Sequence, residues 1–180
     1  MVGSRDAALL GNLIGLAAGD VADFQRVRPF LDPLCRRLEH LGDIGAGASM
    51  KLALNLPHLV YYQVLSEALR LIDHLSLDPH LLISLFADST GGPNLLRIRG
   101  KLIADAMAGA ALPPAQGGVG IFTKDLQVML SQAAQSGTSL PMANVALAEY
   151  RNLQDHHAGD IDGVMLPVLL LQLSRAKQAR

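Results

Sequence analysis

A glycine-rich stretch that ends in a lysine and an asparagine is the part of this chain best suited to chemistry. Residues 45–55 read Gly-Ala-Gly-Ala-Ser-Met-Lys-Leu-Ala-Leu-Asn, a turn that runs into a helix. Positions i and i+4 of a helix share a face, so Lys51 and Asn55 would present an ammonium and an amide side by side. The ammonium can exchange a proton and the amide can orient a substrate oxygen, which suits hydroxyl–carbonyl chemistry. The same spacing also fits two solvated polar residues near a helix start.

The composition favours packed helices. Of the 180 residues, 50% are hydrophobic and 17% are charged, and there is no Trp. Such a chain forms helices with broad apolar faces and fits one domain, or one domain with a fragment of another. The formal net charge of −1, without a basic stripe, disfavours nucleic-acid binding. We expect a large buried surface, part of which two subunits could share.

The single cysteine and the short apolar runs bear on the compartment. Cys35 alone can form neither an internal disulfide nor a thiolate metal framework, which favours a reducing cytoplasm. The first residues lack the apolar segment of an export signal, and polar residues interrupt the apolar runs elsewhere. The most apolar run, 164–173, is too short to cross a bilayer and is typical of a buried helix. We therefore expect a cytoplasmic protein that does not contact membranes.

The first 45 residues carry the only convincing strand. Residues 13–18 are an apolar run closed by Gly19 and Asp20, which predicts a buried strand followed by a helix cap. Over 21–41 the apolar residues recur at helical spacing with two prolines among them, which predicts one or two short helices. A brief extended segment is expected at 40–42.

The rest of the chain has the pattern of an all-helical domain. The longest helix is expected from 48 to 76, bent at Pro57. A loop rich in proline and glycine is expected over 108–120. Further helices are expected at 78–87 after a cap at Asp78, at 94–107, at 123–136 capped by Thr123, at 141–157, and at 163–176 capped by Asp162. The fold class is therefore mainly α, with a short strand-containing segment at the start.

Several short motifs share the order and spacing of one enzyme family. They are Gly11-x-Leu-x-x-x-Ala-Ala-Gly19-Asp20, His40-Leu-Gly42, Gly45-x-Gly47-x-x-x-Lys51-x-x-x-Asn55, Ser66-Glu67-Ala68, Lys124-Asp125-Leu126 and a late Asp162. In this order the chain resembles the β-hydroxyacid dehydrogenases, which include 3-hydroxyisobutyrate dehydrogenase, tartronate semialdehyde reductase and glyoxylate/succinic semialdehyde reductase. The resemblance covers nearly the whole chain but only the C-terminal half of the family's proteins.

The resemblance implies a fold and a division into domains. In this family a Rossmann domain binds NAD or NADP, and a helical domain like the C-terminal domain of 6-phosphogluconate dehydrogenase closes the cleft and forms a homodimer. By this resemblance residues 1–45 would be the end of a Rossmann domain. Residues 46–180 would be the substrate-binding and dimerisation domain.

The resemblance also assigns roles to single residues. Lys51 would be the general acid/base in the interconversion of a small hydroxyacid with its aldehyde or keto form, and Asn55 would hold the substrate. Lys124, with Phe122 beside it, would face the cofactor. For Lys124 the alternative is an exposed lysine in the first turn of a helix.

Two features of the family are missing from this chain. The family's substrate loop aligns with Val2-Gly3-Ser4, so Gly3 and Ser4 are assigned to the substrate while Val2 stands where the family has a serine. The Gly-x-Gly-x-x-Gly fingerprint of dinucleotide sites has no counterpart, because the Gly45-x-Gly47 pair opens a helix outside any predicted βαβ unit. We therefore expect the chain alone to be inactive and not to bind NAD or NADP tightly.

Other interpretations stay open beside this one. The chain could be a non-catalytic helical dimerisation or scaffold protein derived from the same fold, and the two missing features favour that reading. An imine-reductase-like enzyme is disfavoured by Lys51. No metal site is expected, because neighbouring helix residues point apart and a solvated helix end explains the one polar cluster. That cluster comprises His156, His157, Asp155, Asp160 and Asp162.

Overall fold

The computed structural model describes all residues except 4, 112–114, 116–117, 157–160 and 179–180. The chain forms two compact units, Met1–Asn55 and Leu56–Arg180. The boundary falls inside one long helix, α3 (Ala46–Leu71). Pro57 lies within this helix, which was expected to reach residue 76. None of the helices in the described part is both long and apolar enough to cross a membrane.

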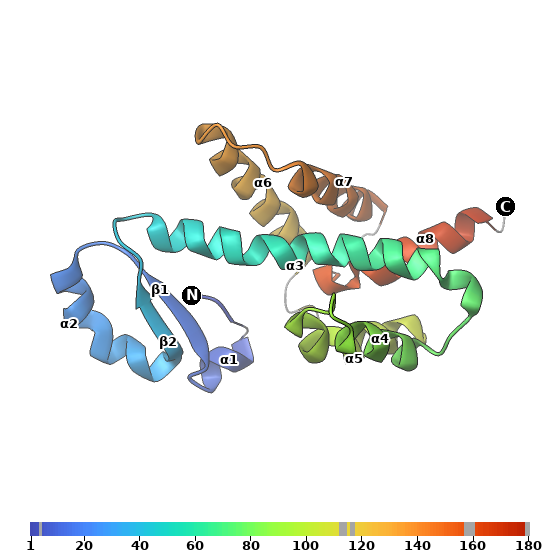
Figure 1. Ribbon diagram of the computed structural model, residues 1–180, viewed down its shortest axis with the longest axis horizontal. Helices are drawn as coiled ribbons and strands as arrows, with labels where there is room; N and C mark the ends of the chain where they lie inside the picture. Colours follow the sequence, from blue (N-terminus) through green and yellow to red (C-terminus); the bar gives the residue numbers. More distant parts are fainter. Residues whose placement is uncertain (4, 112–114, 116–117, 157–160, 179–180) are drawn as a thin grey trace. The chain divides into compact units, whose positions relative to one another are not determined.

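The first unit contains a βαβ arrangement. Strands β1 (Leu13–Ala17) and β2 (Cys35–His40) pair in parallel, and α2 (Val21–Leu31) connects them (Figure 1). Two short helices, α1 (Arg5–Leu9) and η1 (Asp32–Leu34), precede the two strands. Parallel strands need such a crossover, since a tight hairpin can join only antiparallel neighbours. The strand expected at 13–18 is thus confirmed as β1.

The second strand corrects the prediction for the same region. Residues of β2 were expected to be helical, with an extended segment only at 40–42, but they are extended from Cys35 onwards. The reason lies in tertiary packing: β2 pairs with β1, and a side-chain carbon of Leu38 occupies the space that a Cβ at Gly15 would need. Strand preference depends on such neighbours more than on local pattern.

Side chains and backbone groups join the carboxyl ends of the two strands. The predicted cap is confirmed, because the Asp20 carboxylate accepts hydrogen bonds from the backbone N–H groups of Ala22 and Asp23, in the first turn of α2, at 2.8 and 3.0 Å. The N–H of Gly19 donates to the carbonyl of Gly42 over 2.8 Å, and His40 Nε2 donates to the carbonyl of Gly19 over 2.8 Å. The His40 ring also packs on Phe24, with centroids 5.1 Å apart.

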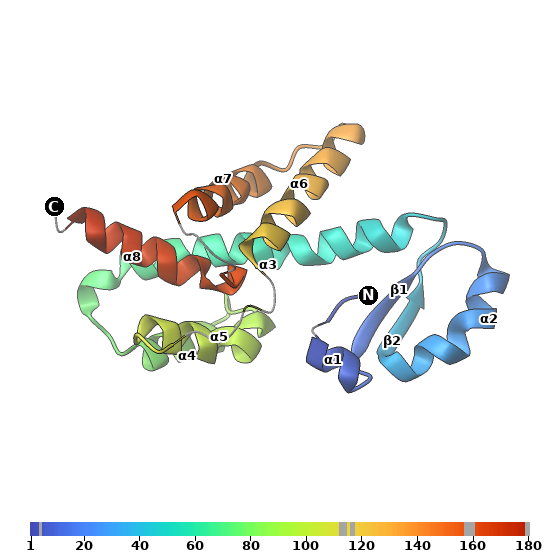
Figure 2. The ribbon, with the colours of Figure 1, turned by 180° about the vertical axis from the view of Figure 1, so that it is seen from behind.

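The second unit is built from helices. They are the part of α3 from residue 56, η2 (Asp73–Leu75), α4 (Pro79–Asp88), α5 (Asn94–Met107), α6 (Val119–Gln135), α7 (Pro141–His156), η3 (Gly163–Met165) and α8 (Leu166–Gln178). Figures 1 and 2 show α4 and α5 as a pair on one side of this part of α3, and α6 and α7 as a pair on the other. The mainly-α fold class is confirmed.

Of the three helix caps that the sequence predicts in the second unit, two are present. The carboxylates of Asp78 and Asp162 accept backbone hydrogen bonds at the starts of α4 and η3, as expected. The predicted cap at Thr123 is wrong, because α6 begins four residues earlier, at Val119. The single hydrogen of the buried Thr123 hydroxyl is instead shared between two acceptors, the Val119 carbonyl at 3.0 Å and Gln154 Oε1 at 2.8 Å. A threonine can satisfy its hydroxyl inside a helix in this way, so its presence alone does not mark a helix start.

The core of the second unit follows helical periodicity. On α3 the buried side chains recur every three or four residues, which is the stripe of an amphipathic helix. Residues 162–168 are all buried, so the most apolar run of the sequence is the start of a buried helix, as expected. The largest buried side chains are Tyr62, Tyr150, Leu59, Leu65, Leu69, Ile103, Leu126, Leu153, Met165 and Leu166.

Candidate functional site

The glycine pair before Lys51 shapes the start of α3. Gly45 has a φ of 99°, a backbone conformation that favours glycine, and its carbonyl accepts the N–H of Ser49 over 3.0 Å. A Cβ at Gly47 would collide with the backbone carbonyl of Leu16, the carbon of which would lie 3.2 Å away. The missing side chain lets the first turn of α3 approach the end of β1. The motif therefore fixes where the helix that carries Lys51 begins.

Lys51 and Asn55 both lie in α3 within the first unit. Since the helix is continuous over 46–71, the i, i+4 pair shares a face, as the sequence predicts. The Lys51 side chain is exposed and that of Asn55 is half-buried. The ammonium group is thus accessible to a ligand that approaches this face.

The amino-terminal loop assigned to the substrate is partly described. Val2 is half-buried and forms an antiparallel bridge with Ile14 of β1. Gly3 is exposed and has a φ of 139°, and a Cβ there would lie 2.6 Å from Leu13 Cδ2. Ser4 lies outside the described residues. The loop is therefore attached to β1 through backbone atoms, and the position of Val2 offers no hydroxyl.

In the second unit, Phe122 and Lys124 lie near the start of α6. The Lys124 side chain is exposed, whereas Phe122 is half-buried against three other rings. Tyr62 stacks nearly parallel to it, with centroids 6.2 Å apart and an interplanar angle of 7°. Tyr150 and His58 meet it edge to face at 5.8 and 6.0 Å. These are favourable arrangements for aromatic pairs.

Burial keeps the polar rings of this cluster neutral. Burial lowers the pKa of His58 below its usual 6.5, and the nearby Asp125 carboxylate opposes this shift. Burial raises the pKa of Tyr62; of the nearby charges, Arg99 lowers it and Asp162 raises it. Burial also raises the pKa of Tyr150, and its hydroxyl donates to the Leu59 carbonyl over 3.3 Å. At neutral pH the three rings that pack against Phe122 are therefore uncharged.

An ion pair joins α5 to the segment before α8. Arg99 Nη2 lies 2.9 Å from Asp162 Oδ2, with side-chain exposures of 20% and 8%. Asp162 also forms a bridge with Gly118, and the N–H of Val119 donates to the carbonyl of Ile161 over 2.9 Å. The start of α6 is therefore attached to the residues around Asp162, for which the sequence indicated only a cap.

Sequence reasoning missed the aromatic cluster and Arg99. The available signal was an arginine in an apolar stripe, because Arg99 lies three residues after Leu96 and four before Ile103, both buried. A charged residue at such a position needs a buried partner. The partner is 63 residues away in sequence, so local spacing could not identify it.

The structure places Lys51 and Asn55 on one face of α3, whereas Phe122 and Lys124 lie two positions apart on α6, with Phe122 half-buried and Lys124 exposed. The two pairs belong to different units, and their joint site stays a prediction. In the described part of the chain, no group of three His, Cys, Asp or Glu residues could hold a metal ion. His157 and Asp160 of the polar cluster noted in the sequence lie outside the described residues.

The chain matches known proteins in sequence. Residues 45–168 match the family described as NAD-binding of NADP-dependent 3-hydroxyisobutyrate dehydrogenase. The chain is 31% identical over 160 residues to glyoxylate/succinic semialdehyde reductase 1 of Arabidopsis thaliana, covering 89% of this chain and 54% of that protein. It is 30% identical over 158 residues to 3-hydroxyisobutyrate dehydrogenase of Pseudomonas aeruginosa, covering 87% of this chain and 52% of that protein.

Solved structures share the fold. A 3-hydroxyisobutyrate dehydrogenase from Salmonella typhimurium superposes with a TM-score of 0.82 at 22% identity, covering 93% of this chain and 57% of that one. The Mycobacterium tuberculosis enzyme of the same name, solved with L-serine, gives 0.76 at 23% identity, covering 94% and 58%. At these identities the likeness supports the fold alone.

The family match over residues 45–168 places the chain in a class of NAD(P)-linked oxidoreductases. Within that class the chain belongs to the β-hydroxyacid dehydrogenase family, as the order of its motifs indicates. It spans about half the length of the curated relatives it matches.

Proposed function

We propose that this chain is the C-terminal part of an NAD(P)-dependent dehydrogenase or reductase that interconverts a small hydroxyacid and its aldehyde or keto form. Lys51 would be the general acid/base and Asn55 would hold the substrate. The observation that carries the proposal is the placement of both residues on one face of α3, within the matched region 45–168. The names of the relatives, which act on hydroxyisobutyrate, glyoxylate or succinic semialdehyde, support the substrate class.

Lys51 would move the proton of this reaction. NAD(P)H, when bound, supplies the hydride that goes to the carbonyl carbon. As that carbon–hydrogen bond forms, the π electron pair of the carbonyl moves to the oxygen, which takes the proton from the Lys51 ammonium. In the oxidative direction the neutral amine of Lys51 takes the hydroxyl proton. Asn55, one turn further along α3, would orient the same oxygen.

The residues of the chain fit the substrate side of such a site better than the dinucleotide side. In the first unit the turn from β1 to α2 reads Ala18-Gly19-Asp20 and lacks the Gly-x-Gly-x-x-Gly sequence that brings backbone close to a pyrophosphate. A further dinucleotide-binding part would therefore be needed for activity. Lys124, with Phe122 beside it, would meet the cofactor from the helical side.

One observation favours a second candidate function. Val2 carries no hydroxyl, although the family has a serine at this place in its substrate loop. A non-catalytic helical dimerisation or scaffold protein would not need that hydroxyl. Loss of the serine alone leaves the proton-transfer residue in place, so we place the enzymatic function first.

The decisive experiment replaces Lys51 in the whole protein that contains this chain. Lys51→Ala should lower the turnover number by roughly two to four orders of magnitude, the usual contribution of general acid–base catalysis, with cofactor affinity nearly unchanged. Lys177→Ala removes another exposed lysine, in the last turn of α8, and should leave turnover unchanged. Equal turnover in the Lys51 variant and the native protein would reject the catalytic role and leave the scaffold function.

A further inference from the structure

We infer that Gly163 and Phe122 act as positioning residues for Lys124, because the ring of Phe122 occupies the space left by the missing side chain of Gly163. The inference rests on the proposed function, in which Lys124 faces the cofactor. It assigns to Phe122 a role inside the second unit, and it makes the short segment before α8 part of the machinery that places a cofactor-side residue.

The first support is the close approach of Phe122 to the backbone of Gly163. A Cβ at Gly163 would lie 2.5 Å from Phe122 Cε2 and 2.9 Å from Cγ. Ordinary contact begins at 3.4 Å, so even a methyl group would force the ring to move by about 1 Å. Gly163 itself is buried. The ring position and the absence of a side chain at residue 163 therefore depend on each other.

The second support is that other rings pack against Phe122 on its buried sides. Tyr62 stacks on Phe122 and Tyr150 meets it edge-on, and both tyrosines are at most 1% exposed. Tyr150 is fixed further by the hydrogen bond from its hydroxyl to the Leu59 carbonyl. Close-packed interiors transmit displacements, so a Phe122 ring that is pushed against these two buried tyrosines also pushes on its helix.

The third support is a set of polar contacts, an ion pair and hydrogen bonds, made by the residues on either side of Gly163. Its neighbour Asp162 is paired with Arg99 and also accepts the N–H of Val164 over 3.0 Å. The N–H of Val119, in the first turn of α6, donates to the Ile161 carbonyl. Because these contacts fix the backbone on both sides of Gly163, a new side chain there would move Phe122 rather than the glycine.

A displacement of Phe122 reaches Lys124 through the helix. The two residues lie two positions apart in α6, whose hydrogen-bonded backbone moves as one body over such a short distance. A misplacement of about 1 Å in a positioning element can lower the efficiency of an enzyme by as much as roughly 100-fold. The exposed ammonium of Lys124 would thus miss the cofactor although its own chemistry is unchanged.

The contact can be tested first in the 180-residue chain itself. The chain has three tyrosines and no tryptophan, so its near-ultraviolet circular dichroism reports mainly on the tyrosines. Gly163→Ala should change this spectrum, because Tyr62 and Tyr150 both touch the displaced ring. Gly120→Ala is the matched control in the first turn of α6, where a Cβ meets only Gln154 Nε2, at 3.4 Å. Identical spectra for Gly163→Ala and the native chain would overturn the inference.

The functional step is tested by a double-mutant cycle in the whole enzyme. Gly163→Ala should raise the KM for NAD(P)H by roughly 10- to 100-fold with a smaller change in kcat. In a protein that already carries Lys124→Ala, Gly163→Ala should raise this KM little further, since the lysine that it displaces has already been removed. Phe122→Leu in the Gly163→Ala protein should restore part of the affinity by making room for the methyl group. Gly120→Ala should leave the KM unchanged.

The outcomes separate this inference from the proposed function. An equal KM penalty from Gly163→Ala with and without Lys124 would overturn the positioning role while the cofactor-side role of Lys124 stands. An unchanged KM in Lys124→Ala alone would reject that role, and the inference with it. If Gly163→Ala does not fold, Phe122→Leu alone takes its place in the cycle: it removes the ring without adding atoms and should raise the KM only while Lys124 is present.

Discussion

Gly47 and Gly163 matter because of the atoms that they lack. At Gly47 the missing side chain lets α3 start against the Leu16 carbonyl, and at Gly163 it makes room for the ring of Phe122. Each glycine lies close to the start of the helix that bears a proposed site lysine, Lys51 on α3 and Lys124 on α6. Side chains that do chemistry are easy to notice in a sequence, whereas the residues that place them can be those without side chains.

The burial of a single residue, His58, makes the stability of the folded chain depend on pH. Its ring lies against Tyr62 of α3 and Phe122 of α6, and the carboxylate of Asp125 on α6 is the charged group that acts on it. Burial lowers its pKa in the folded chain below 6.5, so the unfolded chain binds the proton more readily. The contribution of the neutral His58 ring to the free energy of unfolding is fully present above pH 6.5 and is lost as the pH falls below that value.

The prediction is that native stability falls more steeply than that of His58→Gln when the pH is lowered from 8 to 5.5. The free energy of unfolding of both proteins can be measured by urea denaturation, and the five other histidines contribute equally to each. An NMR titration of the His58 ring should give a midpoint below 6.5. A midpoint above 6.5 would show that Asp125 outweighs burial and would reverse the sign of the effect.

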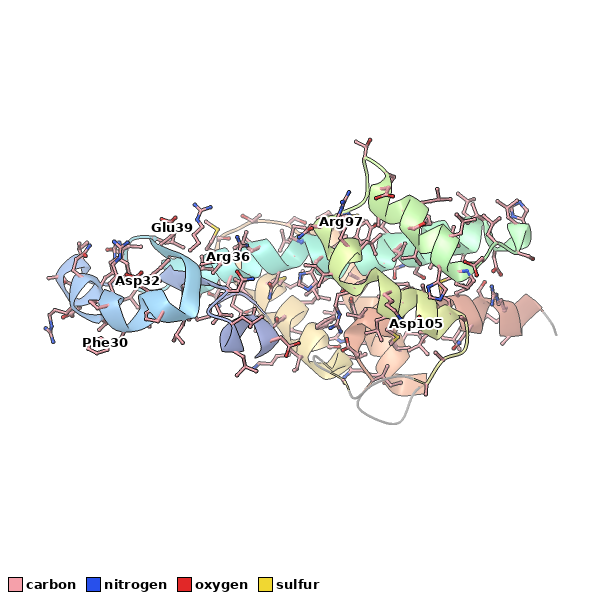
Figure 3. The ribbon with its side chains drawn as sticks, turned by 90° about the horizontal axis from the view of Figure 1, so that it is seen from below. Phe30, Asp32, Arg36, Glu39, Arg97 and Asp105 are labelled. Carbon is pink, nitrogen blue, oxygen red and sulfur yellow. The ribbon has the colours of Figure 1, made fainter. Side chains whose placement is uncertain are left out.

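At the scale of elements, two arginines of α5 form ion pairs that should contribute differently to the free energy of unfolding. Arg97 pairs with Asp88 over 3.6 Å with side-chain exposures of 64% and 79%, and Figure 3 shows Arg97 projecting from α5. Arg99 pairs with Asp162, and these two side chains are only 20% and 8% exposed. Breaking a largely buried ion pair costs about 3–5 kcal/mol, whereas exposed pairs contribute at most about 1 kcal/mol.

Asp162→Ala should therefore lower the free energy of unfolding by several times as much as Asp88→Ala. Asp162→Ala also removes the cap of η3, so Asp162→Asn is the informative intermediate: its amide oxygen can keep the cap while the ion pair with Arg99 is lost. Chemical denaturation of the three variants measures the difference. Similar losses for Asp88→Ala and Asp162→Ala would contradict the view that the buried pair holds the unit together.

The elements also show what local sequence can predict. Helices with caps or regular apolar spacing, such as α4 and α5, have the ends that the sequence indicates, because their signals are local. Strand β2 was missed since it depends on β1 for pairing and on Gly15 for packing, both far from it in sequence. The same holds for the site. Spacing on one helix predicts that Lys51 and Asn55 share a face, but only the tertiary structure reveals the ion pair between Arg99 and Asp162.

At the scale of the whole molecule, the chain alone should not bind a dinucleotide tightly. The described first unit has two strands, and no glycine fingerprint follows either of them. An exposed lysine such as Lys124 can attract a phosphate but cannot replace a cradle of backbone N–H groups. Titration with NADH and NADPH, followed by cofactor fluorescence, should show no saturation in the micromolar range. Micromolar affinity would place the dinucleotide site within these 180 residues.

The second unit should also associate with another copy of itself. Large apolar side chains are exposed on several of its helices, among them Val64 on α3 at 45% and Ile98 on α5 at 69%. Exposed apolar side chains of this size can form an interface between subunits, and identical chains usually associate as symmetric dimers. Sedimentation equilibrium of the 180-residue chain should give a dimer.

Two variants test which unit forms the dimer. Because the family resemblance assigns dimerisation to the helical part, Val64→Lys should weaken the dimer. Phe30→Lys, which changes a 78%-exposed residue on α2 (Figure 3), should not. A monomer at all concentrations, or a dimer that responds only to Phe30→Lys, would refute this assignment.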